Sequence, residues 1–424
     1  MPPEMQVDAR ESSLTHASTQ PPRVAVIGAG PAGLFAAERL AEAGLGVEIF
    51  ERMPSVARKF LMAGRGGLNL THSEPLERFL ARYGAARARL EPMIRAFPPE
   101  ALVAWAEGLG QAMFTGSSGR VFPRAMKASP LLRAWMARLG ALGVRLSVGH
   151  TWQGWDEEGA LRFATAGGER LVARPDAVVL ALGGASWPRL GSDGAWSERL
   201  RARGVAVTAL RAANAGFDVR WSAAFARFAG EPLKGIAIRF GEAVQRGEAM
   251  VTRYGLEGGA VYALSAPLRE AIALDGAARI AVDLRPEMSE ADVAARLARA
   301  AAGQSQTNQL RRALKLSPAA VNLMREAGPL PREAAALAAR VKGVPVTLSG
   351  MQGLERAISS AGGIAWDAVD AGLQLSALPG VYAAGEMLDW EAPTGGYLLQ
   401  GCFATGDAAA AAIITALGAG PRTR

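Results

Sequence analysis

The feature that most constrains this chain of 424 residues is a glycine pattern near its start, between an apolar run and an alanine-rich segment. The apolar run, residues 24–27 with the sequence VAVI, is typical of a buried central strand in a parallel sheet. Three glycines in G-x-G-x-x-G spacing follow it: Gly28, Gly30 and Gly33. In this order they permit a tight turn, let the backbone approach a pyrophosphate, and let the helix pack closely on the strand. The pattern predicts a βαβ unit that binds a dinucleotide, with Pro31 and Ala32 at the helix N-terminus, where unpaired N–H groups favour phosphate.

The second strand of this unit ends in an acidic residue. Residues 47–50 form the predicted strand, and Glu51 stands after it, about twenty positions beyond the glycines. A carboxylate at this place accepts hydrogen bonds from the ribose hydroxyls of an adenosine and repels a 2′-phosphate. We therefore expect Glu51 and the adjacent Arg52 to contact the adenosine half, and we do not expect NADP in this site.

The far end of the chain favours FAD as the dinucleotide. Residues 380–386 read GVYAAGE, a short strand that runs into Gly385 and Glu386. In many flavoproteins a late strand of this kind brings an acid to the ribityl chain and the phosphates of FAD. The pair Gly395 and Gly396 lets the backbone lie against the flavin. The helix that follows points its N-terminus at the flavin N1–C2=O region, where negative charge develops on reduction.

A third strand is predicted at residues 177–182, and it breaks at Gly183 and Gly184. It resembles the strand by which flavoprotein chains re-enter the nucleotide domain. The two chain ends together therefore predict one discontinuous α/β domain of the Rossmann type that binds FAD.

With these pieces in place, the chain resembles the BaiN/YhiN-like family of bacterial FAD-dependent oxidoreductases, the group that includes aminoacetone oxidase. Residues 59–69, KFLMAGRGGLN, are similar to the family's Lys-x-x-x-Ser-Gly-x-Gly-Arg-Cys-Asn segment, which wraps the flavin and pyrophosphate. Other similar stretches are GRVFP at 119–123, GGAS at 183–186, GSDG at 191–194, AGGI at 361–364, GEMLD at 385–389 and TGGY at 394–397. The resemblance implies further cofactor contacts: Lys59, Gly64, Arg65, Gly66, Gly67, Leu68, Asn69 and Leu398.

The chain departs from the family pattern at three places. The family's cysteine is replaced near Leu68, and Leu398 stands where many members carry asparagine. Residues 255–259, GLEGG, take the place of the family's Ser-Gly-Pro, on the side where we expect the substrate.

The middle of the chain follows a different pattern. Apolar residues alternate over 236–240 and 280–284, a period of two that is typical of half-buried antiparallel strands. From residue 288 the pattern becomes helical, with Ser289 and Ser317 placed as helix caps. We predict four parts: a disordered tail at 1–22, the FAD-binding domain at 23–204 and 350–424, a β-rich substrate domain at 205–285 and 343–349, and a helical insert of three short helices at 286–342.

The expected chemistry is hydride transfer between the flavin N5 and a small-molecule substrate held between the two larger domains. Arg120, Tyr254 and Tyr397 are the catalytic candidates for that pocket, and His72 is a weaker one. Each has an alternative role, since Arg120 could fix a loop, Tyr254 could pack in a core and His72 could cap a turn. No residue stands out as a general base. A second nucleotide fingerprint is missing, because the glycines at 108–110 follow a helical segment. This favours an oxidase over an NAD(P)H-dependent reductase, with oxygen or NAD(P)H as the second substrate.

The net charge of +8, with 47 Lys and Arg, suggests an alternative class, a flavin-containing protein that modifies or binds nucleic acid. The basic residues are scattered, however, without a compact run or interleaved aromatic residues, so nucleic acid is not the expected partner. The one cysteine, Cys402, excludes an internal disulfide and is predicted to be a small buried side chain. The three histidines lack metal-ligand spacing, so no metal site is predicted.

The apolar stretches of the chain are short. The longest, residues 408–418, falls below the roughly 20 residues that a membrane-spanning helix needs. The first 22 residues lack the apolar core of a signal peptide. We therefore predict a cytoplasmic protein.

Overall fold

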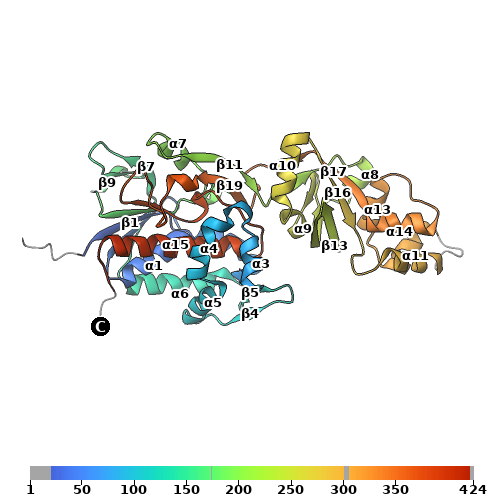
Figure 1. The fold of residues 1–424 in the computed structure, drawn as a ribbon, viewed down its shortest axis with the longest axis horizontal. Coiled ribbons are helices and arrows are strands. Elements are labelled where there is room, and N and C mark those ends of the chain that lie inside the picture. Colours follow the sequence, from blue (N-terminus) through green and yellow to red (C-terminus); the bar gives the residue numbers. More distant parts are fainter. Residues whose placement is uncertain (1–20, 173, 300–304, 421–424) are drawn as a thin grey trace, which may run out of the picture.

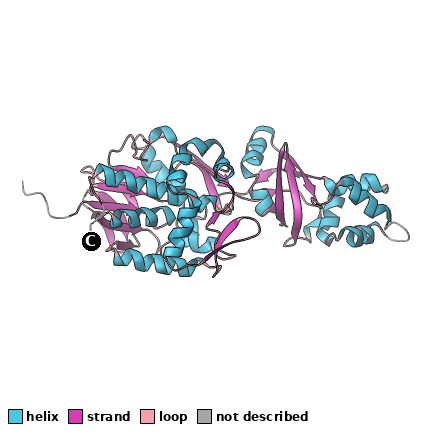
Figure 2. Ribbon diagram, turned by 60° about the horizontal axis from the view of Figure 1, so that its bottom comes forward, coloured by secondary structure: helices cyan, strands magenta, loops and turns pink. Residues whose placement is uncertain are grey.

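The computed structural model describes residues 21–172, 174–299 and 305–420, which form two lobes arranged end to end (Figure 1). Residues 1–20 of the predicted tail lie outside the described residues. The first lobe contains both ends of the described chain, and the second is made from its middle (Figure 1). The same two-lobed arrangement is seen in Figure 2, where strands run through the centre of each lobe.

A parallel sheet of five strands forms the centre of the first lobe, in the order β20-β10-β1-β2-β6. Every neighbouring pair in it is parallel, so the carboxyl ends of the strands meet at one edge. Its strands, in sheet order, are Val381–Ala383, Ala177–Leu180, Arg23–Ile27, Gly46–Glu51 and Arg145–Val148. All residues of β10 and β20 are buried, as expected for strands of a parallel sheet that is covered on both faces.

Helices cover one face of this sheet and a second sheet covers the other (Figure 1). On the helical side, α1 (Pro31–Glu42), α6 (Ala128–Ala141) and α15 (Tyr397–Ala416) meet through aromatic rings. Phe403 of α15 lies with its ring centroid 5.0 Å from that of Phe35 in α1 and 5.4 Å from that of Trp135 in α6. On the other side are the antiparallel strands β7 (Thr151–Trp155), β8 (Leu161–Thr165) and β9 (Gly168–Val172).

Helix α15 is 20 residues long and apolar enough to pass a length-and-composition test for a membrane span. In the structure half of its most apolar window is buried inside the lobe. Gly406 explains how closely it packs, since a Cβ there would lie 2.6 Å from the carbonyl oxygen of Ala32 in α1. Its composition is therefore that of a core helix.

The first lobe contains further short elements. The helices are α2 (Arg58–Ala63), α3 (Leu76–Ala81), α4 (Arg87–Ala96), α5 (Pro99–Gly108) and α7 (Trp196–Arg201). A small antiparallel sheet is formed by β3 (Thr71–His72), β5 (Arg120–Pro123) and β4 (Met113–Thr115). Short 3₁₀ helices occupy Gly84–Ala86, Pro188–Leu190, Trp366–Ala368 and Gly385–Met387.

An antiparallel pair of strands marks the place where the chain leaves the first lobe and returns to it. Strand β11 (Val207–Ala213) pairs with β19 (Ser359–Ile364). Beyond this pair lies a sheet of seven strands in the order β17-β16-β13-β14-β15-β12-β18, in which all neighbouring strands are antiparallel. In that order the strands are Val344–Leu348, Ala278–Asp283, Pro232–Phe240, Ala243–Val251, Gly255–Glu257, Phe217–Asp218 and Gly350–Met351. Helices α8 (Ala223–Ala226), α9 (Gly259–Tyr262) and α10 (Ser265–Asp275) pack beside it.

The far end of the second lobe is helical (Figure 1). Its elements are α11 (Glu290–Arg299), α12 (Gln306–Leu314), α13 (Pro318–Glu326) and α14 (Ala334–Lys342). The two predicted caps are confirmed, because the Oγ atoms of Ser289 and Ser317 accept hydrogen bonds from the backbone three residues later. The prediction of three helices was wrong, since α12 is a further helix. It was missed because its buried face includes a polar residue, Gln309, whose amide donates to the carbonyl oxygen of Leu297 at 2.5 Å.

Candidate functional site

A cavity of about 600 Å³ lies at the carboxyl edge of the parallel sheet. It is lined by the residues that follow β1, β2 and β10, by the 3₁₀ helix Gly385–Met387 after β20, and by the N-terminal turns of α1, α2 and α15. This size lies within the roughly 300–1,000 Å³ range of small-molecule and cofactor sites. The crevice outside the carboxyl ends of parallel strands is also where open α/β sheets bind their ligands.

The glycine loop after β1 forms one wall of the cavity. Gly28 has a φ of +106°, and a Cβ there would lie 2.3 Å from the carbonyl oxygen of Ala181. Gly33 is packed just as closely, because a Cβ there would lie 2.0 Å from the carbonyl oxygen of Gly28. Gly30 differs, since nothing in the chain lies within 4 Å of where its Cβ would be, and it lines the cavity. The loop therefore packs tightly at two glycines and leaves room at the third, in front of the N-terminus of α1.

Glu51 stands at the end of β2 and faces the same cavity. Its Oε2 accepts the backbone N–H of Ala29 at 2.9 Å, and its Oε1 accepts that of Met53 at 2.8 Å. The carboxylate is thus held against the glycine loop while each oxygen keeps a further acceptor position. Arg52 lines the cavity beside it, with its guanidinium paired to Asp193.

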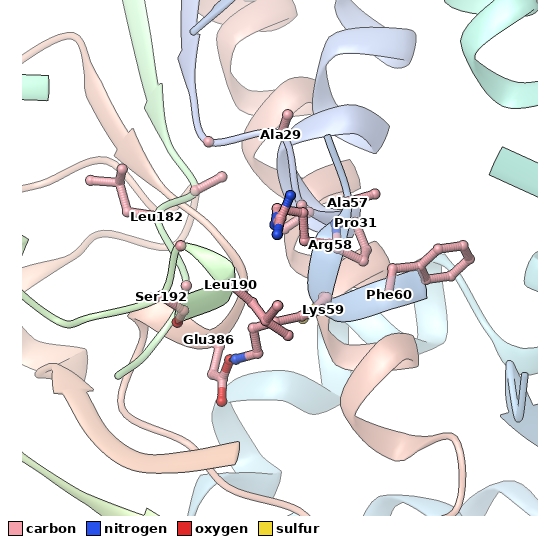
Figure 3. A pocket seen from close by; sticks show the side chains of 18 of the residues that line it. Ala29, Pro31, Ala57, Arg58, Lys59, Phe60, Leu182, Leu190, Ser192 and Glu386 are labelled. Atoms are coloured by element: carbon pink, nitrogen blue, oxygen red, sulfur yellow. The ribbon is translucent and has the colours of Figure 1, made fainter. Parts of the chain in front are cut away.

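Lys59 and Glu386 form an ion pair in the wall of the cavity. The Lys59 ammonium lies 2.8 Å from Glu386 Oε2 and donates to Ser186 Oγ at 2.8 Å (Figure 3). The other oxygen of Glu386 accepts the backbone N–H of Ser360 at 2.8 Å. Gly184 makes room for this group, because a Cβ there would lie 1.8 Å from Ser360 Oγ. The negative charge of Glu386 is therefore balanced within the protein.

Arg58 is a cavity residue that the sequence analysis did not identify. It is the first residue of α2, and Figure 3 shows its guanidinium beside Ala29 and Pro31. The preceding residue, Ala57, adopts a left-handed conformation and donates its N–H to Ala29 O at 2.9 Å, which fixes α2 against the glycine loop. The Arg58 Nη1 donates to Ser55 Oγ at 3.1 Å, whereas its Nε is buried without a partner.

Unpaired polar atoms gather around the cavity. Among the described residues, seven buried side-chain nitrogen or oxygen atoms lack a hydrogen-bond partner, and four of them belong to residues that line it: Arg58 Nε, Asn69 Oδ1, Trp152 Nε1 and Ser192 Oγ. Buried polar groups without partners are rare in folded proteins, because each costs about 1–3 kcal/mol. Their gathering at one cavity indicates a polar ligand that supplies the missing partners. The residues present therefore fit a dinucleotide such as FAD.

The segment 59–69 contributes fewer residues to the cavity than the sequence predicts. Lys59 and Asn69 line it. Phe60, Met62 and Ala63 also line it, whereas residues 64–68 turn away, since α2 ends at Ala63 and a Cβ on Gly64 would lie 2.6 Å from that of Ala128 in α6. Five predicted contacts are therefore not among the lining residues: Gly64 and Leu68 are buried in the core, Arg65 and Gly66 are exposed, and Gly67 is partly exposed.

The loop before α15 supplies the wall opposite the glycine loop. Gly395, Gly396 and Leu398 line the cavity. Gly396 has a φ of +99°, and its Cβ would lie 2.5 Å from the Cα of Thr71. Cys402 lines the cavity one turn further along α15, and burial raises the pKa of its thiol to about 12. The thiol is therefore protonated at neutral pH.

The Tyr397 side chain is buried and is not one of the cavity-lining residues. Its ring centroid lies 4.8 Å from that of Phe79 and 5.5 Å from that of His72. Its hydroxyl donates to Glu74 Oε1 at 2.5 Å. Burial, followed by the hydrogen bond to Glu74, raises the Tyr397 pKa above its ordinary value. The structure thus places this phenol in a buried hydrogen bond.

The other catalytic candidates lie outside the cavity, toward the second lobe. No hydrogen bond or ion pair is found for the Arg120 guanidinium within the described part of the chain, and its Nη2 lies 3.8 Å from the place of a Cβ on Gly259 in the second lobe. The Tyr254 hydroxyl donates to Glu257, and burial together with that carboxylate raises the Tyr254 pKa. His72 behaves as a turn cap, because its Nδ1 accepts the backbone N–H of Glu74 at 3.0 Å.

Together, the parallel sheet, the glycine loop, the acid after β2 and the polar cavity at the carboxyl edge define a flavoprotein of the two-lobed, dinucleotide-binding class. Residues 22–412 match the family described as HI0933-like protein Rossmann domain, and the chain belongs to that family. This confirms the family and the fold class predicted from the sequence. The family is one of FAD-dependent oxidoreductases, and the chain is an enzyme of that class.

Similar proteins support the same class. The chain is 27% identical over 405 residues to a 3-dehydro-bile acid delta(4,6)-reductase of Clostridium scindens, a match that covers 91% of this chain and 97% of that protein. Its fold is similar to that of a 3-ketosteroid-delta4-(5alpha)-dehydrogenase from Rhodococcus jostii RHA1, with a TM-score of 0.51, 17% identity and coverage of 96% and 99% of the two chains. It is also similar to a 3-ketosteroid delta1-dehydrogenase from Sterolibacterium denitrificans, with a TM-score of 0.50, 13% identity and coverage of 94% and 100%.

Proposed function

We propose that the cavity holds FAD and that the enzyme transfers a hydride between the flavin N5 and a small organic substrate bound where the two lobes face each other. The observation that carries the proposal is the gathering of unpaired polar atoms at a cavity whose wall contains the glycine loop. Bound FAD supplies the redox chemistry, and the chain supplies position, charge and exclusion of water.

Different cavity residues would bind the pyrophosphate, the adenosine ribose and the flavin of FAD. Gly30 and the N-terminus of α1 offer the pyrophosphate open space and unpaired N–H groups, and Arg58 adds a positive charge beside them. Glu51 offers its remaining acceptor positions to the adenosine ribose. Gly395 and Gly396 leave the backbone free to lie against the flavin, at the N-terminus of α15.

Arg120 is the proposed anchor of the substrate. It lies on β5, where it pairs with His72 of β3, and its guanidinium approaches the second lobe without an acidic partner in the residues described. A guanidinium donates several hydrogen bonds in a fixed plane and suits a carbonyl or carboxylate oxygen. Tyr254, also in the second lobe, is a neutral phenol at neutral pH, because its pKa is raised. Its single hydroxyl proton is donated to Glu257, so it can accept a hydrogen bond from the substrate.

Two reactions are candidates for this enzyme: an oxidase that passes electrons from the substrate to oxygen, and a reductase that passes them from a donor to the substrate. The lack of a second nucleotide fingerprint in the sequence favours an oxidase that returns electrons to oxygen. The 27% identical relative from Clostridium scindens is a reductase, which favours a reduced donor and an unsaturated organic acceptor.

A pair of anaerobic mixing experiments distinguishes the candidates. The purified holoenzyme is mixed without oxygen with NADH or NADPH, and absorbance near 450 nm is followed before and after air is admitted. Flavin that resists both nucleotides but is reoxidised rapidly by air after chemical reduction supports the oxidase. Rapid bleaching by NADPH or NADH contradicts the oxidase and supports the reductase. Slow reoxidation by air also contradicts the oxidase.

A further inference from the structure

Arg269 is a nearly buried arginine of the second lobe, on α10, with 9% of its side chain exposed. All five N–H donors of its guanidinium have acceptors. The Nε donates to Glu270 at 3.1 Å, Nη1 donates to Ala212 O at 3.1 Å and to Glu391 at 3.0 Å, and Nη2 donates to Glu391 at 2.7 Å and to Glu270 at 3.0 Å. Such a saturated guanidinium holds its neighbours in one geometry.

These acceptors come from both lobes. Glu270 is the neighbour of Arg269 on α10, whereas Ala212 lies on β11 and Glu391 lies in the segment between β20 and α15. Within the described ranges, the ion pairs of Arg269 with Glu391 and of Arg211 with Glu270 are the two that join the lobes. Burial alone would lower the pKa of Arg269, but Glu391 and Glu270 raise it above its ordinary value.

Glu391 leads directly into the cavity wall. Thr394, three positions later, lines the cavity, as do the two glycines that follow it. The segment is held on its other side by Asn214, whose Nδ2 donates to Ala392 O at 2.8 Å and to Ser359 Oγ at 2.7 Å. The ion pair of Arg269 with Glu391 therefore holds one end of a short segment, and Asn214 holds the same segment by hydrogen bonds where the chain passes between the lobes.

We infer that Arg269 is a positioning residue, which couples the orientation of the second lobe to the glycine loop of the cofactor cavity through Glu391. The inference rests on the proposed function in one respect, that this cavity holds FAD. When the bidentate pair with Glu391 is intact, the lobe that carries Tyr254 and the loop at 394–396 keep a fixed relation. When the pair is broken, the angle between the two lobes and the position of the loop at 394–396 change together.

The test compares two variants of the full-length protein, Glu391→Gln and Glu270→Gln. Each removes one negative charge from Arg269, but only Glu391→Gln weakens the pair that crosses to the cavity loop. The apoprotein of each is titrated with FAD by flavin fluorescence, and the radius of gyration is measured by small-angle X-ray scattering. Glu391→Gln should raise the dissociation constant of FAD at least tenfold and enlarge the radius of gyration. Glu270→Gln also weakens the Arg211 pair between the lobes, so it can enlarge the radius of gyration as well, but it should leave the dissociation constant of FAD within twofold.

Wild-type behaviour of Glu391→Gln in both measurements overturns the inference, and so do equal shifts of the FAD dissociation constant in the two variants, because these would reflect charge alone. If Glu391→Gln does not fold, Glu391→Asp replaces it, which keeps the charge but shortens the reach. A smaller shift of both quantities then supports the coupling, and no shift overturns it. Wild-type protein that does not bind FAD would refute the proposed function, and the scattering comparison would still decide whether Arg269 fixes the lobes.

Discussion

The Arg58→Met substitution tests how the cavity holds the pyrophosphate. Methionine keeps much of the aliphatic stem and removes the charge and the N–H donors. In the structure the Arg58 Nε is buried without a partner and the guanidinium lies beside Ala29 and Pro31 (Figure 3). Of the other cations that line this part of the cavity, Lys59 is paired with Glu386 and Arg52 with Asp193. Arg199 also lines the cavity, and its guanidinium donates to Ala195 O and Gln153 Oε1. Within the described part of the chain, Arg58 is thus the cation beside the glycine loop that has no acidic partner.

The size of the effect follows from the bond that is lost. A hydrogen bond to a charged group contributes about 1.5–3 kcal/mol, and about 1.4 kcal/mol corresponds to a tenfold change in affinity. The dissociation constant of FAD should therefore rise roughly 10- to 150-fold in Arg58→Met. Riboflavin lacks phosphates, so its affinity should change little.

The assay is a titration of apoprotein with FAD and with riboflavin, followed by flavin fluorescence at low and high salt. Arg65→Met is the matched control, since Arg65 has the same charge and lies in the same segment but is exposed and is not a cavity residue. It should bind FAD as the wild type does. Equal losses of FAD and riboflavin affinity in Arg58→Met, or no loss of FAD affinity, would refute the reasoning.

Three further predictions concern other parts of the site. Glu51→Ala should weaken FAD binding by removing the ribose acceptor, and unchanged affinity in the same titration would show that the ribose lies elsewhere. Tyr397→Phe should lower the free energy of unfolding by about 1–3 kcal/mol at pH 7, because the hydroxyl donates to Glu74. Burial would raise the pKa of Glu74, but hydrogen bonds from Arg82 and Tyr397 hold it below its usual value of 4.5. This stabilisation is therefore present above pH 4.5 and lost as the pH falls through the lowered pKa of Glu74, so urea unfolding curves of the two proteins should converge as the solution becomes more acidic, and a constant difference would contradict the assignment. Cys402, whose thiol pKa is raised to about 12, should react with iodoacetamide at pH 8 much more slowly than an unfolded control, as followed by mass spectrometry. Alkylation at the control rate would show that the thiol is neither buried nor protonated.

The parts of the site that depend on local spacing could be predicted from the sequence. Gly28, Gly30 and Gly33 occupy the turn, the open wall and the helix contact that their order implies, because those roles are set within one βαβ unit. Glu51 and Glu386 reach the cavity for a similar reason, since each stands at the carboxyl end of a parallel strand or just after it.

The parts that depend on tertiary packing could not be predicted. Arg58 is placed in the cavity by the left-handed turn at Ala57 and by its bond to Ala29, neither of which a sequence pattern indicates. Tyr397 follows a glycine pair, a position that predicts a substrate contact, but the start of α15 directs its ring toward Phe79 and its hydroxyl toward Glu74. The partners of Arg269 lie far along the chain, so no local motif connects them.

The central claim, that the cavity is an FAD site, is tested most directly by the cofactor content of the purified protein. The protein is isolated without added flavin, its absorbance is recorded near 450 nm, and the cofactor released on denaturation is identified by chromatography and mass spectrometry. We predict close to one FAD per chain, or stoichiometric uptake when FAD is added to the apoprotein. Colourless protein that takes up no FAD, or protein that contains a different cofactor, would contradict the account.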